Sequence, residues 1–267
     1  MDGTASVEER KGLRQGAAPD AGPLSPPQHF YRTAAMPCPY VPGRIERKLV
    51  TELAGREAPD FYNELSRGGF RRSHHLAYRP ACFGCQGCVP VRIAATEFSP
   101  GRSLRRIAAR NADLAVRIAE PRASFEQYHV FARYQRSRHY DSEMASMTFG
   151  DFRAMIEDSP VATRLIELRG PRRQLLGACL VDMLDDGVSA VYSFYEPDER
   201  RRSLGSFLIL ALVEDAIGRG LPYVYLGYWI AESPKMAYKA RFRPLEGLGR
   251  DGWKRLDLTP PNGAPAV

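Results

Sequence analysis

The sequence predicts an α+β protein: a mixed sheet flanked by helices, preceded by a smaller, cysteine-containing N-terminal α/β domain. Residues 164–168, 175–184 and 188–195 are consecutive strand-like segments, rich in β-branched and aromatic residues and separated by short turns. An apolar helical segment at 207–217 and a strand-like segment at 223–228 follow them. In the N-terminal half, three closely spaced cysteines lie among shorter strand and helix patterns, which predicts a second, smaller unit.

The composition is that of a soluble protein with a sizeable core. The chain has 267 residues, of which 44% are hydrophobic and 26% charged. No apolar run reaches the roughly 18 residues that span a bilayer, and no hydrophobic segment follows the basic residues near the N-terminus. We therefore expect a cytoplasmic protein with no membrane partner, and a monomer. The net charge of +7 rests mainly on arginine, which makes nucleic acid a plausible partner.

Proline and glycine divide the chain into four expected segments. Both ends are rich in proline and lack apolar periodicity, so we expect flexible tails there. Between them we expect the cysteine-containing domain and a larger C-terminal domain. The segments are 1–33, 34–120, 121–258 and 259–267.

The N-terminal domain is predicted to alternate helices and strands. Ile45, Leu49 and Leu53 have helical spacing that ends at Gly55. Four arginines at 102–110 have the spacing that gathers charge on one side of a helix, either as a solvated face or as a strip facing phosphates. The expected elements are helices at 45–53, 58–67 and 102–110 and strands at 69–80, 89–94 and 114–118.

The C-terminal domain begins with a capped helix. Ser124 is a suitable N-cap, with Gln127 as its capping-box partner, and the helix is expected to end near Arg138 and His139. The predicted core stripe of this helix comprises Phe125, Tyr128, Phe131 and Tyr134. A short helix at 148–156 precedes the three strands.

The order of three strands, a loop, a helix and a further strand resembles that of an acetyltransferase-like (GNAT) domain. In that fold the helix N-terminus binds the pyrophosphate of an acyl carrier through backbone N–H groups. Residues 202–207 fit the usual R-x-x-G-x-G/A pattern only in part, because Phe207 stands where a small residue is expected. This difference argues against ordinary coenzyme A binding.

Three cysteines form the run Cys82, Cys85 and Cys88, whose C-x-x-C-x-x-C spacing lets thiolates converge on one ion. Cys38 lies in a loop stiffened by prolines and is the candidate fourth ligand. An iron–sulfur cluster or zinc would suit these ligands. The alternative is a turn with semi-buried thiols that bind nothing.

The segment 223–244 combines a buried strand with a cationic, aromatic turn. After Gly227, Pro234 can start a short helix that carries Lys235, Tyr238 and Lys239. No acid occurs between Glu232 and Glu246, so the segment could hold a polyanion together with a small apolar group. The alternative is a core strand followed by a solvated basic helix.

Together these motifs resemble the bacterial aminoacyl-tRNA–protein transferases, in their aspartate/glutamate leucyltransferase branch. The resemblance covers roughly residues 36–255. It rests on the motifs at 37–40, 69–73, 82–92, 192–197, 203–205, 226–228 and 235–242. Ser233 departs from it, because relatives often have cysteine before the proline at 234, which suggests that a thiol is not obligatory there.

The resemblance implies transfer of leucine from leucyl-tRNA to the N-terminal α-amine of proteins that begin with Asp or Glu, which marks them for N-degron degradation. It implies a GNAT-like core in which aminoacyl-tRNA replaces acyl-CoA. No cofactor is required for the chemistry, although an iron–sulfur cluster or zinc, as in relatives of the arginyl type, is a possible addition.

The aminoacyl ester is already activated, so the enzyme needs to position the amine, help to remove a proton and stabilise the oxyanion. The catalytic candidates are Tyr225, Tyr228, Lys235, Tyr238, Lys239 and Asp182, with Asp182 or His139 as the general base. Arg71, Arg72 and Arg92 are candidates for the acidic side chain of the acceptor. The other substrate-binding candidates are Tyr192, Phe194, Tyr195, Ser203, Gly205, Gly227 and Arg241.

Three alternatives remain from the sequence. An arginyltransferase would act on the same acidic N-termini with a different donor. A small-molecule N-acetyltransferase would need acetyl-CoA at 202–207, against which Phe207 argues. A non-catalytic, metal-containing RNA-binding protein would account for the arginines and cysteines, but leaves the GNAT-like half unexplained.

Overall fold

The computed structural model describes residues 28–138, 140 and 142–257. The prediction of flexible tails therefore falls largely outside the described residues, as does His139. Residues 31–32, which were assigned to the first tail, form a strand instead, because they pair with residues 49–50. None of the helices in the described part of the chain has the length and apolar character needed to cross a membrane.

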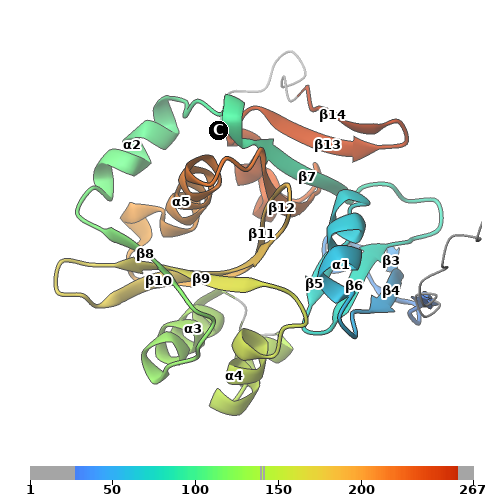
Figure 1. Cartoon of the computed structure of the whole chain (residues 1–267), viewed down its shortest axis with the longest axis horizontal. Helices are drawn as coiled ribbons and strands as arrows, with labels where there is room; N and C mark the ends of the chain where they lie inside the picture. Colours follow the sequence, from blue (N-terminus) through green and yellow to red (C-terminus); the bar gives the residue numbers. More distant parts are fainter. Residues whose placement is uncertain (1–27, 139, 141, 258–267) are drawn as a thin grey trace, which may run out of the picture.

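The centre of the molecule is an eight-stranded mixed sheet with the order β14-β13-β7-β12-β11-β10-β9-β8 (Figure 1). All neighbours are antiparallel except β11 and β12, which are parallel. The strands are β7 (Val89–Ala94), β8 (Ala115–Ala119), β9 (Thr163–Arg169), β10 (Leu175–Met183), β11 (Gly187–Tyr195), β12 (Tyr223–Trp229), β13 (Leu245–Gly249) and β14 (Gly252–Arg255).

Helices cover both faces of this sheet. On one face, α5 (Leu204–Gly218) and α2 (Arg102–Arg110) enclose a core that includes Ile93, Leu208 and Val224 (Figure 1). On the other face, α3 (Phe125–Arg138) and α4 (Phe149–Glu157) enclose an aromatic core. Four short 3-10 helices connect the elements: η1 (Ala95–Glu97), η2 (Glu143–Ser146), η3 (Arg200–Arg202) and η4 (Pro234–Arg241).

A smaller four-stranded sheet, with the order β1-β4-β6-β5, packs beside the large one together with α1 (Ala58–Arg67). Its strands are β1 (Tyr31–Arg32), β4 (Lys48–Glu52), β5 (Arg71–Ser73) and β6 (Leu76–Pro80). A ribbon of β2 (Met36–Pro37) and β3 (Ile45–Glu46) precedes it. The buried residues Tyr62, Ala77 and Tyr225 join this unit to the large sheet.

The predicted helix at 45–53 is wrong, because this segment forms β3 and β4. β4 pairs with β6 along its whole length, from Lys48 opposite Pro80 to Glu52 opposite Leu76. Over nine residues, three apolar positions fit a helical period and a strand almost equally well. Pairing with the neighbouring strand then determines which of the two conformations forms. The predicted domain boundary near residue 120 does not separate the two sheets, since β7 and β8 lie in the large one.

The single strand predicted at 69–80 is also wrong, because the chain turns at His74, where φ is 52°, and forms the antiparallel pair β5 and β6. Most of the remaining elements follow the predictions. The GNAT-like order is present as β9, β10, β11, then α5, then β12 parallel to β11. The capping box of α3 is formed, because Ser124 and Gln127 each donate a backbone N–H to the other's side chain. The predicted core stripe of α3 is only partly right: Phe131 is buried, whereas Phe125 is 65% exposed and stacks on Phe149.

Candidate active site

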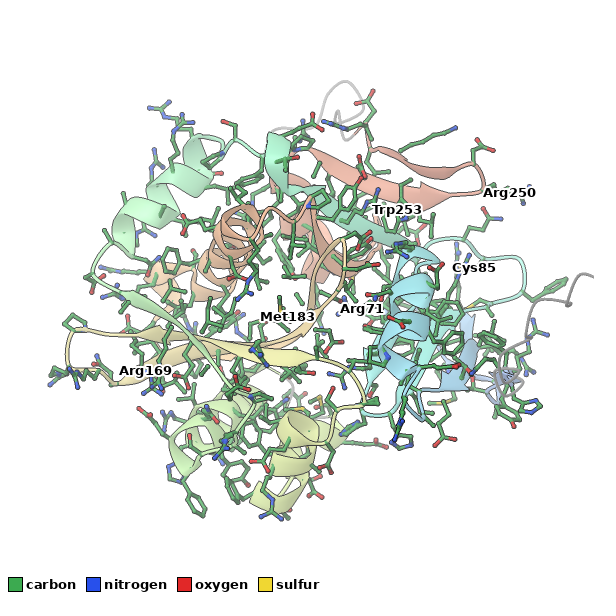
Figure 2. The ribbon with its side chains drawn as sticks, in the orientation of Figure 1. Arg71, Cys85, Arg169, Met183, Arg250 and Trp253 are labelled. Carbon is green, nitrogen blue, oxygen red and sulfur yellow. The ribbon has the colours of Figure 1, made fainter. Side chains whose placement is uncertain are left out.

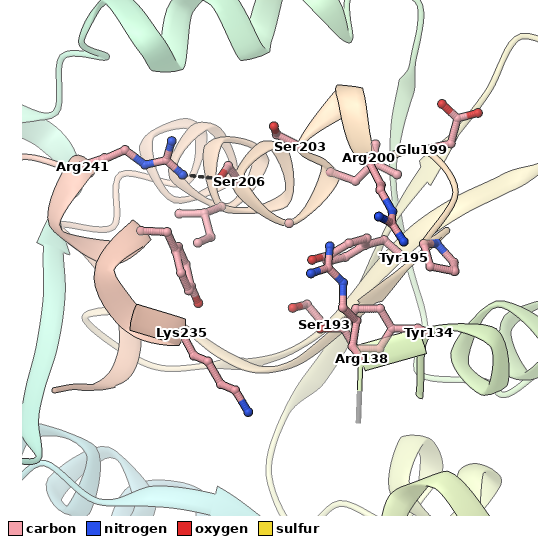
Figure 3. A pocket seen from close by; sticks show the side chains of 15 residues that line it. Tyr134, Arg138, Ser193, Tyr195, Glu199, Arg200, Ser203, Ser206, Lys235 and Arg241 are labelled. Carbon is pink, nitrogen blue, oxygen red and sulfur yellow. Dashed lines mark hydrogen bonds between the residues drawn. The ribbon is translucent and has the colours of Figure 1, made fainter. Parts of the chain in front are cut away.

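A pocket of about 580 Å³ lies at the N-terminus of α5 (Figure 3). Its walls come from the end of α3, the end of β11, the η3 loop, the first residues of α5, and η4. The lining residues are Tyr134, Arg138, Ser193, Tyr195, Pro197, Glu199, Arg200, Ser203, Leu204, Gly205, Ser206, Ile209, Lys235, Tyr238 and Arg241. The pocket therefore joins segments that are distant in the sequence.

The start of α5 is built to leave backbone donors free. Ser203 is the N-cap and has a left-handed conformation, with φ 54° and ψ 47°, and no side chain caps the helix. Gly205 is needed because a Cβ there would lie 2.9 Å from the Tyr195 ring. A helix N-terminus of this kind attracts anions through its N–H groups and its dipole. Phe207 packs against the core and does not line the pocket.

Tyrosines form the apolar side of the pocket. The rings of Tyr134 and Tyr195 meet edge to face, with centroids 4.8 Å apart. Burial and the neighbouring tyrosines Tyr195 and Tyr192 raise the pKa of Tyr134 well above its ordinary value. The Tyr134 hydroxyl is therefore protonated at neutral pH.

Four cations and a single acid, Glu199, line the same pocket. The Arg241 guanidinium donates to the Ser206 hydroxyl at 3.3 Å. The side chains of Arg138 and Arg200 point toward one another, and Lys235 lies on the other side of the pocket (Figure 3). Within the described residues, these last three side chains have no hydrogen bond or ion pair with the protein. Their charges are available to a ligand.

Beside the pocket, β11 and β12 separate. They pair only between 187–189 and 223–225, and the ladder of β12 with β7 is irregular between Tyr225 and Gly227. Gly227 has a φ of +76°, and a Cβ there would lie 2.9 Å from Arg71 Nε. The gap left by the separated strands is therefore occupied by Arg71 rather than by a side chain of β12.

Two cations satisfy the carbonyls that this separation leaves unpaired. Arg71, at the junction of the two sheets (Figure 2), donates to the Ser189 hydroxyl at 3.2 Å and to the carbonyls of Ala190 and Val191. Lys239 Nζ donates to the Leu226 carbonyl at 2.9 Å and to the Tyr228 carbonyl at 2.5 Å on the opposite strand. Burial lowers the pKa of Lys239 to about 7, and the nearby Arg71 adds to this effect.

Several predicted site residues lie away from the pocket. Arg72 and Asp182 form a buried pair, with Nε–Oδ2 at 2.8 Å and Nη2–Oδ1 at 2.6 Å. Arg92 pairs with Glu246 at 2.9 Å and donates to the Tyr225 hydroxyl at 3.1 Å. These groups are already satisfied within the fold.

Three further predicted residues also have partners inside the protein. The Tyr228 hydroxyl donates to the Gly69 carbonyl at 2.9 Å. Tyr192 accepts a hydrogen bond from Gln135 at 2.6 Å, and Phe194 is fully buried against α3 and α4.

The structure thus brings six of the predicted residues to one pocket: Tyr195, Ser203, Gly205, Lys235, Tyr238 and Arg241. Their catalytic or binding roles stay predictions. Sequence reasoning missed Tyr134, Arg138, Arg200 and Ser206 as site residues. A signal was present for Arg200, which lies in a basic run directly before α5.

The four predicted metal ligands Cys38, Cys82, Cys85 and Cys88 line one small cavity of about 80 Å³. Hydrogen bonds from the Gly87 backbone and from Arg44, at 3.1 Å, lower the pKa of Cys85. Burial, followed by the charges of the other three cysteines, raises the pKa of Cys88 to about 11. Four thiols suit zinc or an iron–sulfur cluster. Within the described residues, however, no three metal-ligating side chains are arranged to hold one ion.

Comparison with known proteins places the chain in a family. The family described as "Arginine-tRNA-protein transferase, N terminus" matches residues 36–106, and its C-terminal counterpart matches residues 126–249. The aspartate/glutamate leucyltransferase of Paramagnetospirillum magneticum is 54% identical over 245 residues, which are 92% of this chain and 100% of the relative. That of Granulibacter bethesdensis is 53% identical over 237 residues, 89% of each chain.

Among solved structures, L-PGS from Bacillus licheniformis is similar to 68% of this chain and 52% of its own, with 12% identity and a TM-score of 0.44. This likeness is too distant to bear on activity. The sequence matches cover most of the chain and include both the cysteine-containing half and the pocket. The chain therefore belongs to the aminoacyl-tRNA–protein transferase family, in its aspartate/glutamate leucyltransferase branch.

Proposed function

We propose that this protein is an aminoacyltransferase that moves leucine from leucyl-tRNA to the N-terminal α-amine of proteins that begin with Asp or Glu. The observation that carries the proposal is the identity of more than half of the residues with aspartate/glutamate leucyltransferases over nearly the whole chain. The added leucine would mark the acceptor for N-degron degradation. The pocket at the start of α5 is the natural place for this reaction, because it offers three cations without a partner among the described residues, beside an aromatic wall.

The donor's 3′ end belongs at the start of α5. Its phosphates would accept hydrogen bonds from the free N–H groups of the helix and ion pairs from Arg138 and Arg200. The terminal adenosine and the leucyl group would lie against Tyr134 and Tyr195, since base stacking on aromatic rings is a common means of holding a single strand.

The body of the tRNA can continue from the pocket onto α2. Arg110 donates to the Arg201 carbonyl, and Asn111 donates to the Arg202 carbonyl at 2.8 Å, so the end of α2 is joined to the η3 loop. Arg102, Arg105 and Arg106 are exposed on this helix, and Arg105 is bonded only to a backbone carbonyl within the described residues. Their charge would neutralise phosphates of the acceptor arm.

The reaction needs no covalent intermediate. The acceptor's α-amine attacks the ester carbonyl carbon, so a C–N bond forms and the ester C–O bond breaks. The amine gives up a proton, and the terminal ribose oxygen of the tRNA takes one as it leaves. The Tyr238 hydroxyl, which lines the pocket, can donate a hydrogen bond to the carbonyl oxygen while it carries negative charge.

A transfer assay tests the function. Purified protein is mixed with tRNA charged with labelled leucine, or separately with labelled arginine, and with peptides that begin with Glu or Ala. We expect label only with leucine and the Glu peptide. If label is transferred only from arginyl-tRNA, the reaction is the proposed one but the donor is arginine. The arginine arm is a necessary control because the matching family is described as arginine-tRNA-protein transferase. No label with either donor, under reducing and anaerobic conditions, would refute the proposal.

We further propose that the cavity lined by Cys38, Cys82, Cys85 and Cys88 holds zinc or an iron–sulfur cluster after local adjustment of the loops. Metal analysis of anaerobically purified protein should give close to one equivalent of zinc, or of one cluster. A value well below one would refute this proposal without affecting the transfer reaction.

Because charged tRNA is used in the cytoplasm, we place the protein there, acting as a monomer.

A further inference from the structure

The proposed reaction requires a cation that recognises the acidic side chain of the acceptor. The three arginines that the sequence suggested for this task are all committed within the fold. Arg71 binds carbonyls of β11, Arg72 binds Asp182, and Arg92 binds Glu246. Arg72 and Arg92 are buried and Arg71 is half-buried, and each would leave its partners unsatisfied if it turned to a substrate. The acceptor's carboxylate must therefore be held by another residue.

The pocket cations fall into two groups that suit different anions. Arg138 and Arg200 point toward one another near the start of α5 (Figure 3), and two guanidinium groups facing each other favour a phosphate between them. Arg241, which lies on η4 like Lys235, is bound to Ser206. Lys235 is exposed, lies on the other side, and has no protein partner within the described residues.

The chemistry of a lysine fits an acceptor that can be either Asp or Glu. The two carboxylates differ in reach by one methylene, and a point charge on a flexible four-carbon stem can follow both positions, whereas a rigid guanidinium fork fits one geometry best. Lys235 also stands three residues from Tyr238 on a 3-10 helix, and residues at this spacing share one side. Both residues line the pocket.

We propose that Lys235 binds the side-chain carboxylate of the acceptor's first residue and thereby selects acidic N-termini. This inference rests on the proposed transferase function. The ion pair fixes the acceptor by its side chain and leaves its α-amine facing the ester held at α5. The positive charge also lowers the pKa of that amine, which favours the neutral, nucleophilic form.

The test compares Lys235→Met and Lys235→Glu with the wild type, using leucyl-tRNA and peptides that begin with Glu, Asp, Gln or Lys. Lys235→Met should raise KM for the Glu and Asp peptides by about tenfold to a hundredfold, the usual range for a lost charged hydrogen bond. The preference for Glu over Gln should collapse, while KM for leucyl-tRNA changes less than twofold. Lys235→Glu should shift preference from Glu toward Lys.

Matched controls are Lys254→Met and Lys254→Glu, since Lys254 is an exposed lysine on β14 that contacts Asp251 and does not line the pocket. Both should leave the Glu-to-Gln preference unchanged, and thermal unfolding should show that all variants fold. An unchanged preference in folded Lys235 variants, or a rise in KM for leucyl-tRNA alone, would overturn the inference. If the wild type itself transfers nothing, the proposed function fails instead, and the two failures are thereby distinguished.

Discussion

The cations at the junction of the two sheets differ from three of the four pocket cations in one respect: whether the protein supplies their partners. At the junction, Arg71 and Arg72 are bound to carbonyls or to a carboxylate. In the pocket, Arg138, Arg200 and Lys235 have no such partner within the described residues. Arginine content therefore says little about binding in this chain, whereas the absence of an internal partner identifies the charges that a ligand can use.

The energetic consequences of the two arrangements are opposite. A buried cation that loses its partner lowers the free energy of unfolding strongly. An exposed cation without a partner changes that free energy little, and it contributes binding energy once an anionic ligand is bound. Substitutions at the junction should therefore change stability, and substitutions in the pocket should change substrate binding. Three experiments test this contrast.

The largest effect is expected at the junction. Arg72→Leu leaves Asp182 buried without its partner, and we expect the free energy of unfolding to fall by about 3–5 kcal/mol. Urea unfolding measures this change. The double substitution Arg72→Leu, Asp182→Leu removes both charges and should recover much of the loss. A single variant as stable as the wild type would show that the junction pair is not what holds the two sheets together.

The next effect concerns pH. The pKa of Lys239 is lowered from 10.5 to about 7 in the folded protein. Between these values the unfolded chain holds the proton and the folded chain does not, so stability rises with pH by up to about 1.4 kcal/mol per unit from this group. Below pH 7 both states are protonated and the contribution is flat. Urea unfolding of Lys239→Met at pH 7.5 and 9.5 should show a smaller rise than the wild type. Equal slopes would mean that Lys239 keeps its proton over this range.

The smallest effect on stability, and a clear one on binding, is expected in the pocket. Arg200→Gln removes one of the two facing guanidinium groups, and we expect KM for leucyl-tRNA to rise about tenfold at physiological salt, less at high salt. The free energy of unfolding should change by less than about 0.5 kcal/mol. Steady-state kinetics at two salt concentrations checks both points. Loss of stability without a change in KM would place Arg200 with the structural cations.

Much of the fold could be predicted because the signals are local. The apolar run of α5, the capping box of Ser124 and Gln127, and the strands β9 to β11, which are rich in β-branched and aromatic residues and separated by turns, each carry their own pattern. The helix predicted at 45–53 failed because strand pairing with β6, which the segment cannot encode alone, decided its conformation. The expected domain boundary near residue 120 does not fall between the two sheets, because β7 finds its partners far along the chain.

The roles of the candidate site residues stay predictions, and the structure shows only which of them share the pocket. The segment 223–244 did supply Lys235, Tyr238 and Arg241 to the pocket. Its neighbours Tyr225 and Tyr228 were predicted to be catalytic, yet their hydroxyls bind Asp186 and the Gly69 carbonyl. Residue type and spacing cannot show whether a cation or a hydroxyl has a partner elsewhere in the fold. Whether a side chain has a partner depends on tertiary structure and is visible only in the folded protein.

The position of β7 has a consequence for synthesis of the protein. Val89–Ala94 lies between β12 and β13, so both neighbours of this strand are made long after it. At roughly 5–20 residues per second, β7 waits on the order of ten seconds on the ribosome with both edges unpaired. During that interval it is an apolar strand with no native partner, which is the kind of segment that chaperones bind. The large sheet is therefore completed as one of the last events of translation, and a chain that ends before residue 245 leaves its central strand with an open edge.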